Sequence, residues 1–68
     1  MTLGQKIAET WLPDNKRLQR QLAIRIDAAH SAHAQKAAEK IEHYVANEFY
    51  CAFNDYDRKR VKTIILEP

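Results

Sequence analysis

Three side chains of types that bind metal ions lie three residues apart in this chain. Asp27, His30 and His33 would fall on adjacent turns of one helix. Two imidazoles and a carboxylate form a usable ligand set for a transition metal. No fourth ligand follows at a matching spacing, and a pair of titratable histidines at a surface or hinge has the same pattern. We therefore predict no metal site.

The remaining reactive side chains do not have the spacing of a catalytic site. Cys51 has His43 and Glu48 nearby in the sequence, but a helix would turn them to different sides. Glu39 and His43 lie four residues apart, which is typical of an ordinary surface pair. Gly4 is the only glycine, so no glycine-rich loop is available to hold a phosphate or an oxyanion. The sequence therefore predicts a protein that is not an enzyme and uses no cofactor.

Positive charge is gathered in two runs, although the formal net charge is only +2. The runs consist of Lys16, Arg17, Arg20 and Arg25, and of Arg58, Lys59, Arg60 and Lys62. Tyr56 precedes the second run and could stack on a phosphate-bearing ligand or position it. Asp55 and Asp57 flank this tyrosine, however, which is typical of a solvated surface. Contact with nucleic acid therefore stays open on charge grounds.

The element that must position most of these side chains is predicted within residues 28–54. Its apolar side chains recur at steps of three or four residues and would share one helix face: Ala34, Ala38, Ile41, Val45, Phe49 and Ala52. At about 100° per residue, Tyr50 falls on the opposite, polar face. We expect this helix to run from about residue 31 to about residue 54, with Ser31 as its N-cap.

A short helix is predicted before it, over residues 3–12. Thr2 and Gln5 have the spacing of a capping box, in which each side chain binds the backbone N–H of the other. Apolar residues at helical spacing follow, and Pro13 ends the helix. A helix this short has to pack on other elements, so we expect Trp11 to be an anchor in the core or at an interface.

Residues 15–29 fit two interpretations. A helix capped by Asp14 or Asn15 would gather four apolar residues on one stripe. Ile24 distinguishes the two, because it lies off that stripe but in line with Leu22 and Ile26 in a strand. The good helix formers of the segment and its lack of a turn residue favour the helix. A break near residues 30–31 would then fold the two long helices into a hairpin.

The strand interpretation leads to a second hypothesis for fold and function. The run QLAIRID over residues 21–27, followed by a helix, resembles the opening of the ribbon-helix-helix repressors. The resemblance implies a dimer whose strands pair and present alternate polar side chains to the major groove of DNA. Gln21, Ala23 and Arg25 would then contact DNA. The chain departs from the family pattern because no glycine-type turn divides the following region into two helices.

The last segment is predicted to be an extended tail. Residues 54–57 have turn composition, and residues 61–66 are rich in β-branched side chains. The expected fold is therefore mainly α: a three-helix cluster of a short N-terminal helix and a helical hairpin, with an extended or β-like tail over about residues 61–66. A dimer of the ribbon-helix-helix type is the alternative.

Length and composition limit the cellular context. Sixty-eight residues provide a single domain, 1–68, whose core alone gives marginal stability, so we expect self-association as a dimer or a larger oligomer. A lone cysteine excludes an internal disulfide and fits the reducing cytoplasm. Residues 1–12 lack the apolar run of a signal peptide, and no stretch approaches the about 20 apolar residues of a membrane span. We therefore expect a cytoplasmic protein without membrane contact.

Together these features predict a small binding protein that acts as a regulator, an inhibitor or an adaptor. A protein is the first candidate for its macromolecular partner. The expected contact residues are Trp11, Tyr50, Tyr56, Arg58, Lys59, Arg60 and Lys62. The alternative is a dimeric DNA-binding transcriptional repressor of the ribbon-helix-helix type, with Gln21 and Arg25 at the DNA.

Overall fold

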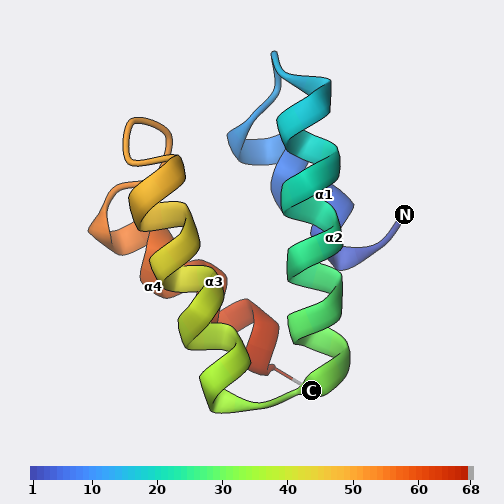
Figure 1. The fold of residues 1–68 in the computed structure, drawn as a ribbon, viewed down its shortest axis with the longest axis vertical. Coiled ribbons are helices and arrows are strands. Elements are labelled where there is room, and N and C mark those ends of the chain that lie inside the picture. Colours follow the sequence, from blue (N-terminus) through green and yellow to red (C-terminus); the bar gives the residue numbers. More distant parts are fainter. Residues whose placement is uncertain (68) are drawn as a thin grey trace.

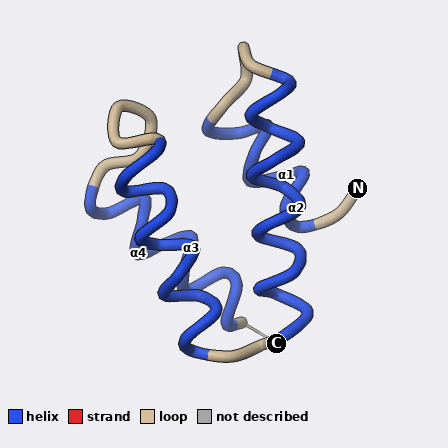
Figure 2. The backbone as a smooth tube through the Cα atoms, viewed as in Figure 1, coloured by secondary structure: helices blue, strands red, loops and turns tan. Residues whose placement is uncertain are grey.

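Two helical hairpins joined at one end make up the chain in the computed structural model, which describes residues 1–67 (Figure 1). The first hairpin is formed by α1 (Leu3–Trp11) and α2 (Lys16–Ala32), and the second by α3 (Gln35–Glu48) and α4 (Asp55–Leu66). The hairpins meet at residues 33–34, and α2 and α3 diverge toward the end where both hairpin turns lie (Figure 1). Helices and loops account for all of the described residues (Figure 2). The prediction of a mainly α fold is therefore confirmed, with four helices instead of three; Pro68 lies outside the described residues.

Helix α1 begins at the predicted capping box and lies close against α2. The side-chain oxygen of Thr2 accepts from the N–H of Gln5 at 3.1 Å, and the Thr2 N–H donates to the Gln5 side chain at 2.9 Å. A Cβ at Gly4 would overlap the carbonyl oxygen of Ala23, so only glycine permits this approach. The Gly4 N–H donates to Oδ1 of Asp27 at 2.8 Å, which lets a carboxylate on α2 cap the start of α1.

Helix α2 is continuous through residues 21–27, so the ribbon-helix-helix hypothesis is wrong. Asn15 caps it by accepting from the N–H of Leu18 at 3.0 Å. Leu22 and Ile26, one turn apart, are fully buried, whereas Ile24 is 64% exposed. Burial of one helical stripe therefore outweighs the alternation of apolar and polar residues that was compatible with a strand.

The break between α2 and α3 lies later than predicted. His33 ends α2 in the left-handed conformation, with φ of 48°, and α3 begins after Ala34, whose side chain makes no cap hydrogen bond. Ser31 remains inside α2, so its predicted role as an N-cap is wrong. The left-handed residue at the end of α2 makes the reversal, a position that glycine usually occupies.

The middle of the apolar stripe predicted around residues 34–52 forms the centre of the core, whereas Ala34 is exposed as the N-cap of α3 and Ala52 is only partly buried. Ala38, Ile41, Val45 and Phe49 are all buried, while Lys36 and other polar residues of α3 are exposed. The helix is shorter than predicted, because Phe49 is already its C-cap. The rest of the core comes from both hairpins and their turns: Ile7, Ala8, Leu12, Leu22, Ala23, Ile26, Ala29, Phe53, Val61 and Ile65.

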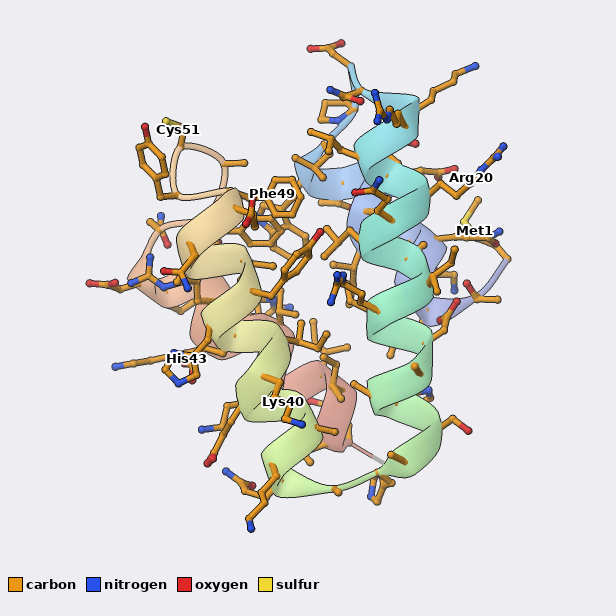
Figure 3. All side chains as sticks on the ribbon, in the orientation of Figure 1. Met1, Arg20, Lys40, His43, Phe49 and Cys51 are labelled. Carbon is orange, nitrogen blue, oxygen red and sulfur yellow. The ribbon has the colours of Figure 1, made fainter. Side chains whose placement is uncertain are left out.

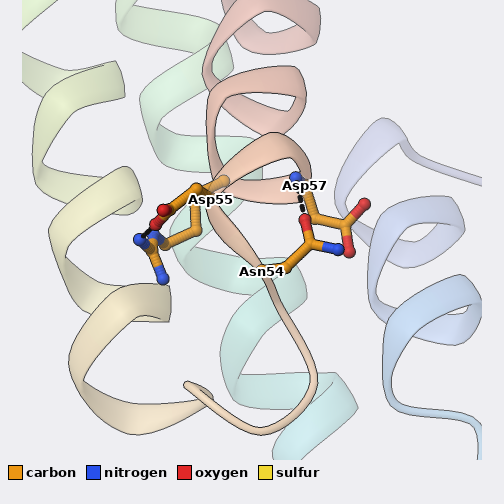
Figure 4. A network of polar contacts seen from close by, with 4 residues as sticks. Asn54, Asp55 and Asp57 are labelled. Carbon is orange, nitrogen blue, oxygen red and sulfur yellow. Dashed lines mark hydrogen bonds and ion pairs between the residues drawn. The ribbon is translucent and has the colours of Figure 1, made fainter.

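The predicted extended tail is helix α4. Asn54 caps this helix by accepting from the N–H of Asp57 at 2.8 Å (Figure 4). Asp55 and Asp57 lie in its first turn, where negative charge is favourable to the helix dipole. Val61 and Ile65, one turn apart, are fully buried. The β-branched composition predicts a strand here, but burial of this stripe outweighs the low helix propensity of those residues.

Aromatic side chains fill the space where the two hairpins diverge. Trp11 stacks on Phe53 with ring centroids 5.2 Å apart, and Phe53 lies 6.3 Å from the ring of Phe49. Tyr44 meets Phe49 edge-on at 5.4 Å. Figure 3 shows Phe49 pointing from the second hairpin into this space. The open end of the molecule is therefore closed by packed rings.

Candidate functional site

Two exposed tyrosines lie at the end of the second hairpin where α3 turns into α4. The backbone of this turn is held by Phe49 and Phe53, which are both buried and joined by a 3.0 Å hydrogen bond from the Phe53 N–H to the Phe49 carbonyl. Tyr50 is left 71% exposed, and Cys51 projects at the end of the second hairpin (Figure 3). Tyr56, in the first turn of α4 at the same end, is 69% exposed. We call the surface of residues 50–60 the hairpin tip.

The basic run predicted as a contact surface is divided by the fold. Arg58 forms an ion pair with Asp55 one turn earlier on α4 (Figure 4). Nζ of Lys62 lies 3.9 Å from a carboxylate oxygen of Glu42 on α3. Lys59 and Arg60 are exposed, and neither forms an ion pair within residues 1–67. The uncompensated positive charge of α4 therefore lies at residues 59–60.

The other predicted contact residues lie away from this exposed surface. Trp11 is half-buried, and its ring stacks on Phe53, which lies in the turn of the hairpin tip. Gln21 is exposed on α2. The guanidinium carbon of Arg25 lies 4.3 Å from the ring centre of Tyr44, so this arginine links α2 to α3 by a cation–π contact.

The residues considered for metal binding and catalysis are also separated. Asp27 caps α1, and His33 forms the reversal between the hairpins. No three His, Cys, Asp or Glu side chains converge to hold a metal ion in the part of the chain that the structure describes. His43 lies along α3, well away from Cys51 at the tip (Figure 3).

Comparisons of the chain with family models, curated proteins and solved structures find no match. The exposed surfaces are therefore the basis for assigning a function. Within residues 1–67, no helix has the length and apolar character that crossing a bilayer requires.

A second exposed apolar surface lies on the first hairpin. Met1 is 77% exposed and Ile24 is 64% exposed, and both line a groove of about 510 Å³ between α1 and α2. The buried residues Ala8 and Ala23 also line it. None of these residues was predicted as a contact residue. The available signal was Ile24 itself, since an apolar residue off the buried stripe of a helix has to face solvent or a partner.

Proposed function

We propose that this chain is a small, non-enzymatic binding protein that acts as a regulator, an inhibitor or an adaptor by holding a protein partner at the hairpin tip. The observation that carries the proposal is the exposure of Tyr50 and Tyr56, at 71% and 69%, at one end of the second hairpin. Tyrosine is enriched among the residues that dominate binding energy, because it combines a large rigid ring with a hydroxyl.

The positive charge beside the tyrosines favours a partner with acidic groups. Lys59 and Arg60 are exposed on the same half of α4 as Tyr56 and are free of ion pairs among the described residues. Such side chains at the rim of an interface favour a partner with acidic groups around an apolar pocket. Arg58 and Lys62 are already paired with carboxylates, so we expect them to contribute less.

The rigidity of the tip also favours binding. Phe49 and Phe53 are buried on either side of the turn, and Trp11 stacks on Phe53 from the first hairpin. A surface that is already ordered loses little conformational entropy when a partner docks. Trp11 is therefore proposed to act as a positioning residue for the tip.

The non-enzymatic part of the proposal is supported by where the reactive side chains lie. Cys51 and His43 are both exposed and occupy separate places on the second hairpin (Figure 3). Neither lines the groove on the first hairpin. The cytoplasmic location and the self-association remain predictions from the single cysteine and the short chain.

The test compares capture of a partner by the native chain and by a tip variant. Tagged native chain is incubated with native lysate, with and without nuclease, and the bound proteins are identified by mass spectrometry. The identified partner is then purified and titrated against the native chain and the Tyr50→Ser, Tyr56→Ser double variant. The matched control is Thr10→Ala, at an exposed position of the first hairpin that lies outside both the tip and the groove.

We expect a nuclease-resistant partner whose affinity falls by about tenfold or more in the tip variant and is unchanged in the control. Equal affinity for the native chain and the tip variant would overturn the proposed surface. Loss of all bound proteins on nuclease treatment would instead show that the partner is a nucleic acid.

A further inference from the structure

The groove on the first hairpin faces away from the second hairpin. Figure 3 shows Met1 and Arg20 projecting on that side, opposite to the side on which Cys51 and His43 lie. Met1 and Ile24 are the exposed apolar residues of this surface, and they belong to one groove instead of being scattered singly. Polar and charged side chains such as Gln5 and Arg20 make up the rest of its exposed lining, so a partner for this groove has to match charge as well as cover Ile24.

Side chains of opposite charge lie on α2 on the two sides of Ile24. Arg20 lies one turn before it, and Asp27 lies about one turn after it. All three residues line the groove. One oxygen of Asp27 accepts from the N–H of Gly4, and its other oxygen retains capacity for a second donor.

We propose that two copies of this chain pair through this surface, with a two-fold axis at Ile24. In an antiparallel pairing of the two α2 helices, Ile24 meets Ile24 of the second copy. Arg20 then lies opposite the turn that contains Asp27 of the second copy, and the same contact repeats on the other side of the axis. The proposal specifies the self-association within the proposed function, and it does not depend on the hairpin tip.

A dimer has to cover more of the first hairpin than the groove alone, and the small side chains of α2 permit close approach. A standard interface buries about 800 Å² per partner, which is about a sixth of the 4722 Å² of accessible surface of this chain. Ala28, one turn after Ile24, is small and exposed, so the second copy can approach the backbone there. The charged residues that line the groove are of both signs, Lys16 and Arg20 with Glu9 and Asp27, so they can pair with those of a second copy.

The pairing leaves both hairpin tips free. The tip and the groove lie on different hairpins, and Figure 3 shows their labelled residues on opposite sides of the molecule. A dimer of this kind presents two copies of Tyr50 and Tyr56, which provides the two binding sites that an adaptor needs.

The test uses the symmetry of the proposed axis. The mass of the full chain in solution is measured by analytical ultracentrifugation over a wide range of concentration, for the native chain and for Ile24→Lys and Ile24→Glu. Because residue 24 meets itself across the axis, each variant alone places like charges together. We expect the dissociation constant of each to rise by about tenfold or more, and an equal mixture of the two to recover dimers. Ile24 is exposed, so both variants keep the helical content of the native chain, checked by circular dichroism.

Four results would overturn the proposal, each in a distinguishable way. A native chain that stays monomeric at every concentration would remove self-association altogether. Dimers that persist in both variants would place the interface elsewhere, and a mixture that stays monomeric would exclude a two-fold axis at residue 24. The control is Tyr50→Lys, which is expected to leave the dimer intact while weakening capture of the protein partner. Dimers that are lost in this control would move the interface to the hairpin tip.

Discussion

The indole of Trp11 is stacked on the ring of Phe53, with centroids 5.2 Å apart and planes 21° from parallel. Trp11 ends α1, and Phe53 lies in the turn before α4, so this contact joins the two hairpins at the end where they diverge. α1 otherwise packs chiefly on α2. The ring pair therefore couples the stability of the short N-terminal helix to the geometry of the hairpin tip.

Shortening the side chain at Phe53 tests this coupling. Phe53→Leu leaves a partial cavity beneath Trp11 and is expected to lower the free energy of unfolding by about 1–2 kcal/mol. Urea unfolding followed by circular dichroism measures the change, and the emission of the only tryptophan should shift as its ring loses its partner. Tyr56→Leu, at an exposed position, is the control and should stay within about 0.5 kcal/mol of the native chain. Equal losses in the two variants would contradict the role given to the stack.

Gly4 is predicted to be required for helix packing in spite of its poor helix propensity. Gly4→Ala improves the propensity of α1 by about 1 kcal/mol, but the added Cβ would overlap the carbonyl oxygen of Ala23. We expect a net loss of about 1–3 kcal/mol because backbone has to move. Thr10→Ala, at an exposed position of the same helix, should cost far less. A Gly4→Ala variant more stable than the native chain in thermal melts would refute the close approach of α1 to α2.

The carboxylate of Asp27 is expected to hold the start of α1 on α2. Asp27→Ala removes the acceptor for the Gly4 N–H and should lower the free energy of unfolding by about 1–2 kcal/mol. Asp27→Asn keeps an acceptor oxygen without the charge, so it should restore part of the loss. Chemical unfolding of the native chain and the two variants under one set of conditions provides the measurement. An alanine variant as stable as the native chain would show that the hydrogen bond contributes nothing.

The left-handed residue at the reversal between the hairpins offers a stabilising change. His33 has φ of 48°, a conformation that costs about 1 kcal/mol for a residue with a Cβ. His33→Gly removes this cost and is expected to raise the free energy of unfolding by about 0.5–1 kcal/mol. Ser31→Gly, two residues earlier within α2, should instead be destabilising by a similar amount. Thermal melts that showed both glycines to be destabilising would argue against the left-handed turn.

Part of the hairpin tip could be predicted from the sequence. Tyr50 falls opposite the buried stripe when counted as a helix, and it is exposed, although it lies in a turn just beyond the end of α3. The division of the basic run could not be predicted, because the partner of Lys62 is Glu42, on another helix. The place of Trp11 under the tip likewise depends on Phe53, which is distant in the sequence.

By itself, the sequence determined the local features whose causes are local. The capping box of Thr2 and Gln5 and the buried stripe of α3 both depend on residues within a turn or two of each other, as does the cap of α2, which the sequence narrowed to Asp14 or Asn15. Such signals are short-range hydrogen bonds and periodic burial, and both can be recognised without knowing what lies opposite. The predicted helices at residues 3–12 and 15–29 followed from them, with shifted ends.

Only the tertiary structure decided the features whose energy comes from contacts between distant residues. Residues 61–66 are helical because Val61 and Ile65 are buried against the other helices, which outweighs their β-branched propensity. Contacts between distant residues also decide where the chain reverses, at His33, and why position 4 needs glycine. They likewise separate the two exposed surfaces. In these features burial and close packing between helices stabilise the fold by more than the unfavourable local conformation costs.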